Sequence, residues 1–313
     1  MNNVPEPPGM VAPLDLSIIV VNWNTRDLLA NCLQSIYDTV HDLTFEVIVV
    51  DNASTDGSAD MVRERFPQVR LIENAENVGF AKANNQGIKR SSGRYIVLLN
   101  SDTVVRSKAI AHLTTFLDTH PDAGACGPLL LNPNDTLQPS CYPFLTAGRE
   151  FWRLIFLDRV IRIGSYPMNH WDTKSPHNVE VVSGACLALR REALNHVGLL
   201  DERYFMYSEE MDLCYRLHQE GWRIYWVPQA HVMHYGGQST RQMAHEMYLQ
   251  LYRSKAQFQE KFWGKRGAKR FQRLIRLAYW PRWLVASLFG ICAPAYRIRA
   301  QLYRRLLGER FVT

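Results

Sequence analysis

Paired cysteines and cysteine–histidine metal motifs are missing from this sequence of 313 residues. There is no CxxC pair and no group of His and Cys at the spacing of a zinc site. The sequence therefore offers no structural zinc site and no dithiol redox centre. Each cysteine has apolar neighbours, where a free thiol behaves as a small hydrophobic side chain. We expect reduced core residues of a cytoplasmic protein at Cys32, Cys126, Cys141, Cys186, Cys214 and Cys292.

Glycine-rich phosphate-binding motifs are also absent. The chain contains neither GxGxxG nor a Walker-type lysine loop. Dinucleotide and P-loop chemistry are therefore unsupported, and any bound diphosphate must be neutralised in another way.

No uninterrupted apolar run approaches the twenty or so residues of a membrane-spanning helix. The segment WPRWLVASLFGICAPAY (280–296) comes nearest, but it contains Arg282 and two prolines. The N-terminal stretch MNNVPEPPGMVAPLD lacks the basic start and apolar run of a signal peptide. We expect residues 1–14 to be a disordered leader.

Buried strands alternate with helical patterns in the first half of the chain. LSIIVVNWN is a continuous apolar run of the kind that a parallel sheet buries on both faces. Four such alternations predict βαβ units and a mainly parallel sheet flanked by helices, an α/β fold. The predicted strands are 16–24, 45–54, 69–74 and 94–102, and the helices between them lie near 28–36, 58–66 and 77–91.

Periodicity weakens between residues 133 and 178, which we interpret as a variable insertion. Regular patterns then return, and they predict structured segments at 179–194, a helix over 209–221, a strand pair over 223–235 and a helix over 242–262.

Polar residues follow three of the predicted strands. Ligands of open α/β sheets bind outside the carboxyl ends of the strands, so these side chains could ring a nucleotide, with Asp51 accepting hydrogen bonds from a base or ribose. The alternative is that they cap helices and form turns. The residues concerned are Asn22 and Asn24, Asp51 and Asn52, and Asn100 and Asp102.

Asp102 ends a buried strand and is suited to a divalent cation, because Mg²⁺ and Mn²⁺ prefer oxygen ligands. Such an ion would act as a Lewis acid on a leaving diphosphate.

Three acids crowd into four residues at the start of a predicted helix: Glu209, Glu210 and Asp212. They could simply complement the helix dipole. Crowding also raises carboxyl pKa values, which suits a general base. His231 and His234 flank a strand end, and the following Gly236-Gly237 allows the backbone to pass close to a ligand.

In this order, the segments resemble family 2 glycosyltransferases of the GT-A fold, and most of all the bacterial rhamnosyltransferase and galactofuranosyltransferase group. The similarity covers roughly residues 15–240. Its segments are IIVVNWN, VIVVDNASTDGS, NVGFAKANNQGI, VLLNSD, VVSGACLALRREAL, GLLDERYFMYSEEMDLCYR and VPQAHVMHYGG.

The resemblance implies roles for individual residues. Asp51 matches the nucleotide-contacting aspartate, and Asn100-Ser101-Asp102 takes the Asp-x-Asp position with Asp102 as its only carboxylate. His234 matches a histidine that joins the metal site, whereas His231 remains structural. Glu210 takes the place of the aspartate that acts as the base, with Glu209 and Asp212 as alternatives. The other expected donor-binding residues are Asn22, Asn24, Asn52, Asn84, Asn100 and Ser101.

The implied reaction is an inverting displacement that needs Mg²⁺ or Mn²⁺. The donor is a nucleotide-diphosphate sugar, with dTDP-rhamnose favoured and a UDP-sugar possible. The acceptor is a hydroxyl of a lipid-linked or polysaccharide glycan of the cell envelope. Two alternatives remain. A sugar-nucleotide pyrophosphorylase would carry a basic glycine-rich loop after its first strand, and a non-catalytic sugar- or lipid-binding scaffold would not need Asp102, Glu210 and His234 together.

We predict a catalytic domain over 15–262, with a nucleotide-binding half (15–122) and an acceptor half (123–262) that includes the insertion. A basic amphipathic helical tail follows over 263–313. From Arg253 onward, fifteen Lys and Arg face two acids, a net charge of +13, so that the preceding residues carry −7.

We predict that this tail is an interfacial segment on the inner face of the cell membrane. Pro281 and Pro294 would limit any helix there to about a dozen residues. Packing on the catalytic domain is the alternative, and nucleic-acid binding is disfavoured because a large apolar content accompanies the charge. The sequence does not specify an oligomeric state.

Overall fold

The computed structural model describes residues 14–311, apart from the side chains of Thr240 and Arg241. Of the predicted leader, residues 1–13 lie outside the described residues. The main sheet has the order β3-β2-β1-β4-β11-β6-β12-β5, and β1 to β4 are parallel. The strands along this path are β1 (Leu16–Asn22), β2 (Phe45–Asp51), β3 (Arg70–Glu73), β4 (Tyr95–Asn100), β5 (Thr103–Val105), β6 (Ala123–Leu131), β11 (Cys186–Arg190) and β12 (Arg223–His234). Two short strands of the insertion, which pair with β6 and β12, complete the ten-stranded sheet.

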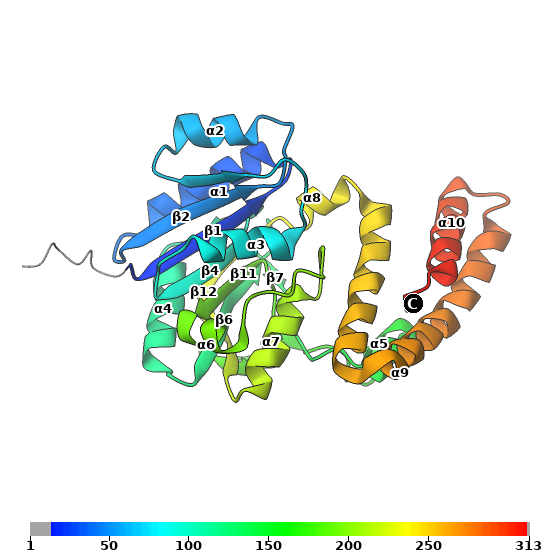
Figure 1. Cartoon of the computed structure of the whole chain (residues 1–313). Helices are drawn as coiled ribbons and strands as arrows, with labels where there is room; N and C mark the ends of the chain where they lie inside the picture. Colours follow the sequence, from blue (N-terminus) through cyan, green and yellow to red (C-terminus); the bar gives the residue numbers. More distant parts are fainter. Residues whose placement is uncertain (1–13, 312–313) are drawn as a thin grey trace, which may run out of the picture.

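Alternating side chains of these strands build two cores, one on each face of the sheet. Ile18 and Val20 of β1 face one core, whereas Ile19 between them faces the other. This two-sided burial explains the continuous apolar runs of the sequence. The first core is covered by α1 (Arg26–Thr39), α2 (Ser58–Arg65) and α4 (Ala109–Thr119), and the second by α3 (Phe80–Lys89), α6 (Arg191–Val197) and α7 (Glu209–Gln219) (Figure 1).

The predicted mainly parallel α/β sheet flanked by helices is confirmed, but the strand pair over 223–235 is wrong. These residues form the single strand β12, whose pairing with β6 is irregular between Val227 and His231. Pro228 lies in that interval and has no N–H to donate to the neighbouring strand, so the ladder is interrupted while the strand continues.

The insertion consists of short elements. It contains β7 (Leu137–Gln138), β8 (Cys141–Tyr142), α5 (Ala147–Leu154) and β9 (His177–Val179), together with two 3₁₀ turns, Leu157–Arg159 and Met168–His170. β10 (Val181–Val182) follows it and pairs with β8. Short elements of this kind carry no extended periodicity, which is why the sequence pattern fades there.

The cysteine expectation holds at five positions and fails at one. Cys32, Cys126, Cys141, Cys186 and Cys214 are buried, and none of the six is in a disulfide, but Cys292 is exposed. Its apolar neighbours in the sequence lie on a solvent-facing segment rather than in a core.

A long helical element, α9 (Ala244–Phe289), begins shortly after β12 and forms most of the tail. It is broken at Gly264, whose φ of 67° and ψ of −177° are not helical and suit a residue without Cβ. After this break the chain turns away and returns antiparallel as α10 (Pro294–Gly308) (Figure 1). Among the described residues, no helix has the length and apolar character needed to cross a bilayer.

The expected limit of about a dozen residues for the tail helix is wrong. Pro281 lies inside α9, which continues to Phe289. The missing N–H of Pro281 leaves the carbonyl of Leu277 without its helical donor. Leu277 is exposed, so water can satisfy that carbonyl and the helix persists.

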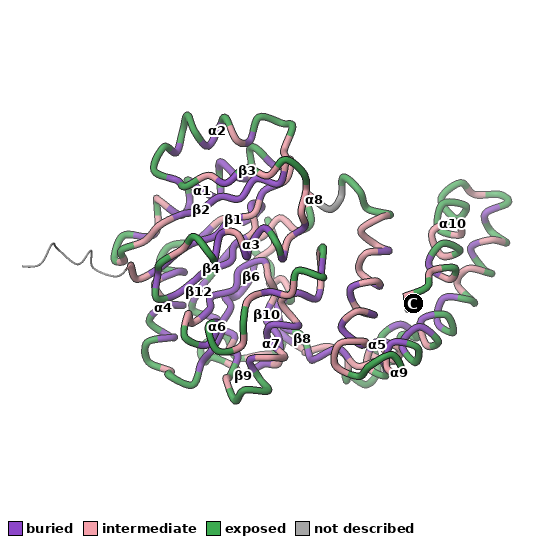
Figure 2. Tube along the Cα trace, in the orientation of Figure 1, coloured by how far each residue is buried: buried purple, intermediate pink, exposed green. Residues whose placement is uncertain are grey.

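The tail packs on α5 and on the first part of α9 around a third core (Figure 2). Its buried polar centre is Glu150, which is 4% exposed. Glu150 lies 2.7 Å from Lys255 and 2.9 Å from Arg153. Burial acts to raise the pKa of Glu150, but the two cations outweigh it and lower the pKa from 4.5 to about 2. α5 is thereby joined to α9 by a desolvated ion pair.

We predict that Glu150→Gln lowers the free energy of unfolding at pH 7 by about 3 kcal/mol, because Lys255 loses a buried anion. A carboxylate whose pKa is depressed by folding stabilises above its unfolded pKa, and that contribution is lost as pH falls from 4.5 towards about 2. Urea unfolding at pH 7 and near pH 3 should show the wild-type advantage shrinking. Glu246→Gln removes an exposed partner of Arg305 and serves as the control with little effect.

Candidate active site

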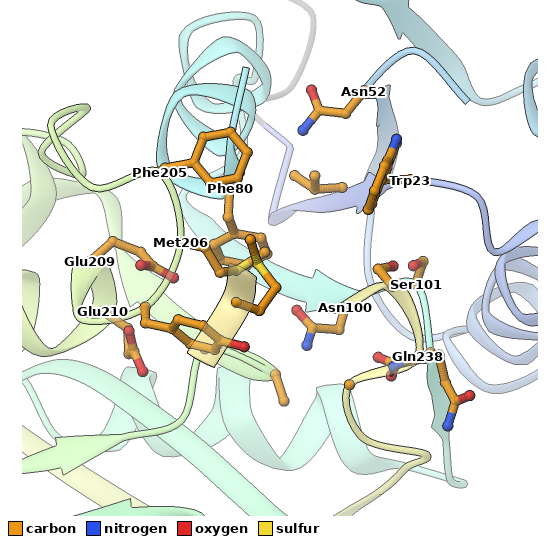
Figure 3. A pocket seen from close by; sticks show the side chains of 18 of the residues that line it. Trp23, Asn52, Phe80, Asn100, Ser101, Phe205, Met206, Glu209, Glu210 and Gln238 are labelled. Atoms are coloured by element: carbon orange, nitrogen blue, oxygen red, sulfur yellow. Dashed lines mark hydrogen bonds between the residues drawn. The ribbon is translucent and has the colours of Figure 1, made fainter. Parts of the chain in front are cut away.

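A cavity of about 370 Å³ opens at the carboxyl ends of β1 and β4 and extends to the start of α7 (Figure 3). Polar and apolar side chains line different parts of it. The polar residues include Asn52, Asn77, Asn100, Ser101, Asp102, Glu209, Glu210, His234 and Gln238, and the larger apolar and aromatic ones are Trp23, Phe80, Phe205, Met206, Tyr207, Met243 and Met247.

The strand ends meet because β1 lies between β2 and β4. Asn22 is paired in register with Asp51, and Val21 with Asn100. The Asn22 amide donates to Oδ1 of Asp51 at 2.9 Å, and the amide N–H of Ser54 donates to Oδ2 at 2.8 Å. Asn22 and Asp51 do not line the cavity; they join the two loops beneath it.

The remaining predicted donor-binding asparagines have different positions. Asn24 adopts a φ of 51° and accepts the N–H of Thr55 at 2.7 Å, which again joins two loops. Asn52 lines the cavity and accepts from Asn74. Asn84 is buried in α3, where its amide donates to the carbonyl of Phe80. Of these three, only Asn52 lies in the cavity wall.

Asp102 and His234 come together across the β5–β12 pairing. Oδ1 of Asp102 lies 3.3 Å from Nε2 of His234, and Oδ2 accepts the N–H of Gln238 at 3.3 Å. Burial acts to raise the pKa of Asp102, but the hydrogen bond and charge available from His234, with the Gln238 amide, outweigh it and lower that pKa. The site thus favours an ionised Asp102.

The tautomer of His234 is set by Gln138, a residue of the insertion. Nδ1 of His234 lies 2.7 Å from Oε1 of Gln138. The amide nitrogen of Gln138 donates to Asn132 and to the carbonyl of His234, which fixes which end of this amide accepts. Nδ1 must therefore carry the proton, and the lone pair of a neutral His234 lies on Nε2, towards Asp102.

This pair fits a divalent cation. The 3.3 Å contact between Oδ1 of Asp102 and Nε2 of His234 is attractive when Nε2 carries a proton. A divalent cation could take the place of that proton, because neighbouring ligands of an ion with bonds of about 2.1 Å lie roughly 3 Å apart. Within residues 14–311, no group of three or more His, Cys, Asp and Glu side chains could hold a metal. An ion here would need further oxygen ligands from a substrate diphosphate and water, as is usual for Mg²⁺.

Glu209 and Glu210 begin α7 and face the cavity opposite Trp23 and Ser101 (Figure 3). One carboxyl oxygen of each, Oε2, is buried without a hydrogen-bond partner. Burial raises the pKa of both, and the neighbouring charge of Glu210 raises that of Glu209 further. Two crowded carboxyls that lack a cation hold a proton readily, which is the property of an acid–base pair.

The turn that aims these glutamates is strained. Tyr207 and Ser208, directly before α7, have φ values of 68° and 69°, a region that bulky residues rarely adopt. Two residues before Tyr207, the carbonyl of Phe205 accepts the N–H of Phe80 at 2.7 Å, which fixes the start of this turn. Gly79 allows this approach, since a Cβ there would lie 2.5 Å from that carbonyl oxygen.

Asp212 lies away from the cavity. It is fully buried and contacts Arg216 at 2.7 Å and Lys261 of α9 at 2.6 Å, and it accepts the hydroxyl of Tyr204. Arg216 also donates to the carbonyls of Val197 and Leu199. The third acid of the cluster is thus saturated by cations and anchors α7.

Several residues of the wall were not singled out by the sequence. Trp23 lies within the first predicted strand segment, and Phe205, Met206 and Tyr207 directly precede the acid cluster. Only their position beside the recognised motifs pointed to the site. An aromatic residue next to a buried strand or helix is usually interpreted as a core residue, so this signal was weak. Gln138 had no signal at all.

A parallel sheet with a carboxylate–histidine pair at its strand ends, opposite acids at the start of a helix, is the arrangement expected of a GT-A glycosyltransferase. The model of "Glycosyl transferase family 2" matches residues 17–198. The chain belongs to this family and is a glycosyltransferase.

One relative is the N-acetylglucosaminyl-diphospho-decaprenol L-rhamnosyltransferase of Mycobacterium tuberculosis, 31% identical over 245 residues, which span 72% of this chain and 77% of the relative. Among solved structures, the mannosyltransferase PcManGT from Pyrobaculum calidifontis, in complex with GDP-Man and Mn²⁺, has a TM-score of 0.55 at 19% identity, covering 96% of this chain and 89% of the other. GalNAc-T7 with UDP, GalNAc and Mn²⁺ also scores 0.55, at 16% identity, covering 72% and 44%. These structures establish the shared fold.

We predict that Asp212→Asn destabilises the protein by about 3 kcal/mol or more, because Lys261 and Arg216 lose a fully buried counter-charge. Asp60→Asn is the control, since Asp60 forms an exposed pair with Arg63 and should change nothing measurable. Urea unfolding of both variants provides the measurement. Normal stability of Asp212→Asn together with lost transfer would instead give Asp212 a direct catalytic role.

Proposed function

We propose that this glycosyltransferase moves a sugar from a nucleoside-diphosphate donor to an acceptor hydroxyl in one inverting displacement, with Glu210 as the base. The observation that carries the proposal is the pair of buried, unpartnered Oε2 atoms of Glu209 and Glu210, opposite the Asp102–His234 pair across one cavity. No lysine or arginine is among the cavity-lining residues described, so these carboxyl oxygens are available to a hydroxyl group of a substrate.

The two glutamates divide the work. Burial raises the pKa of both, and two crowded carboxyls favour one shared proton between them. In our proposal this proton resides on Glu209 and Glu210 is ionised. Glu210 can then accept the proton of the acceptor hydroxyl as that oxygen attacks the anomeric carbon. Glu209 remains neutral and can donate a hydrogen bond to a sugar oxygen.

Asp102 and His234 would hold Mg²⁺ or Mn²⁺, and such an ion stabilises the negative charge of the departing nucleoside diphosphate. The PcManGT and GalNAc-T7 structures contain Mn²⁺, which supports the choice of ion. Asn52, Asn100 and Ser101 line the donor side of the cavity. Asn22, Asn24 and Asp51 position the loops that carry the nucleoside.

We predict that Glu210→Gln lowers turnover by roughly 10²–10⁴-fold and leaves donor affinity nearly unchanged. The amide preserves the shape of the side chain but cannot accept the proton. Turnover is measured with the natural acceptor, and donor affinity by calorimetry. A variant that keeps its turnover would remove Glu210 from the mechanism.

We predict that excess EDTA abolishes transfer and that Gln138→Leu weakens Mn²⁺ binding about 10- to 100-fold, since His234 then loses the partner that orients its ring. Mn²⁺ affinity is titrated in the presence of a nucleoside diphosphate. Gln34→Leu is a matched control, because Gln34 is exposed on α1. Full turnover of metal-stripped protein would contradict the proposal.

We further propose that the donor sugar is a 6-deoxyhexose, with dTDP-rhamnose first. The name of the M. tuberculosis relative states an L-rhamnosyltransferase, and the side chains of Phe205, Met206 and Met243 give the cavity an apolar part that suits a methyl group. A thermal-shift panel should rank dTDP-rhamnose above UDP-glucose and GDP-mannose. A shift with UDP-glucose alone would contradict this choice.

The acceptor we propose is lipid-linked and is reached from the membrane surface on the cytoplasmic side. The M. tuberculosis relative is named for a diphospho-decaprenol acceptor. In this chain, the second part of α9 exposes Leu277, Trp280, Leu284, Leu288 and Phe289 to solvent, directly after the basic stretch from Lys265 to Arg276. Apolar side chains among Lys and Arg favour an interfacial position on anionic lipid.

A further inference from the structure

The loop after α5, residues 155–163, presents apolar side chains to solvent. Six of its nine residues are large, hydrophobic and exposed: Ile155, Phe156, Leu157, Val160, Ile161 and Ile163. Val160 is 81% exposed and Ile161 58%. Contiguous apolar surface of this kind marks an interaction site.

The loop is also a built structure, in which several backbone N–H groups find acceptors within the loop itself. The N–H groups of Val160 and Ile161 donate to the carbonyl of Leu157. Oδ1 of Asp158 accepts the N–H of Ile163 at 3.0 Å and that of Gly164 at 2.7 Å. A segment that enters the apolar edge of a bilayer must satisfy its backbone in this way.

Arg282 of the tail fastens the loop to α9. Its guanidinium donates to the carbonyl of Leu154 and lies 4.9 Å from the ring centre of Phe156. Arg159 lies 4.7 Å from the same ring. Phe156 has a φ of 66°, an unusual value for a bulky residue, and is held there between two cations. The exposed loop and the exposed side of α9 therefore adjoin.

The charge around this surface indicates what the surface binds. The chain from Arg253 onward carries fifteen Lys and Arg against two acids, and Asp158, the only acid of the loop, is engaged by the loop's own N–H groups. Along α9, basic residues dominate the exposed side from Lys265 to Arg276, and apolar ones from Leu277 to Phe289. A positive zone beside an apolar zone matches the headgroup and acyl regions of an anionic bilayer.

We propose that residues 155–163 insert into the interfacial region of an anionic membrane together with the exposed side of α9, as one docking surface made of two distant segments. This rests on the proposed membrane attachment by the tail and adds a second contact from the catalytic domain. The loop and the tail are different segments that Arg282 joins, so the surface has two separate contacts with the lipid. The loop contact fixes the orientation of the cavity relative to the lipid.

Two fluorophore positions test this proposal in the full chain. The exposed Cys292 reports on the tail, since the other five cysteines are buried and unreactive. Val160→Cys in a Cys292→Ser background reports on the loop. An environment-sensitive probe at either position should shift to shorter wavelength with vesicles of phosphatidylcholine and phosphatidylglycerol, and much less with phosphatidylcholine alone.

Substitution gives a second readout. Val160→Ser with Ile161→Ser should lower the vesicle partition coefficient about tenfold, whereas Val160→Leu with Ile161→Leu keeps the apolar surface and should retain binding. Thermal unfolding should be unchanged in both, because these side chains are exposed. If the emission of the loop probe does not shift while that of the Cys292 probe does, the inference is overturned and only the tail contact remains. If neither probe shifts, the membrane attachment itself is wrong.

Discussion

The buried carboxylate of Asp212 determines where the catalytic helix lies. It is contacted by Arg216 from its own helix and by Lys261 from α9. Through Arg216 the same cluster reaches the carbonyls of residues 197–199. A fully desolvated anion with two cations tolerates little displacement, because any gap exposes an unpaired charge. The start of α7 is thereby fixed relative to the sheet and to the helix that leads to the tail.

The side of the cavity where we propose that the acceptor binds depends on that anchor. α7 projects Glu209 and Glu210 into the cavity wall, where burial raises the pKa of both carboxyls and the charge of Glu210 raises that of Glu209 further. On the other side, Gln138 orients His234 towards Asp102. In the proposed mechanism, the Asp102–His234 pair attracts the cation and the two glutamates hold the proton, which is the charge arrangement that a displacement at a nucleotide sugar needs.

Sequence patterns predicted the sheet because its strands are buried on both faces and read as continuous apolar runs. They also predicted that Asn52, Asn100 and Asp102 share one edge, since parallel strand ends coincide. They did not predict Gln138, which sits on a two-residue strand in a region without periodicity. Nor did they distinguish the anchoring Asp212 from Glu209 and Glu210, because all three share one helical turn and differ only in which face tertiary packing covers. The expected limit on helix length at Pro281 is wrong for a related reason. The carbonyl of Leu277 lies on an exposed part of the helix, where water replaces the lost hydrogen bond.

In the proposed site, the cation and the proton acceptor occupy opposite walls of one cavity. Anomalous diffraction from Mn²⁺ in crystals grown with a nucleoside diphosphate tests this arrangement most directly. We expect a peak within coordination distance of both Oδ1 of Asp102 and Nε2 of His234, with no peak beside the glutamates. A peak held by Glu209 and Glu210 instead would contradict it, because those unpartnered carboxyls would then serve as metal ligands rather than as the acid–base pair.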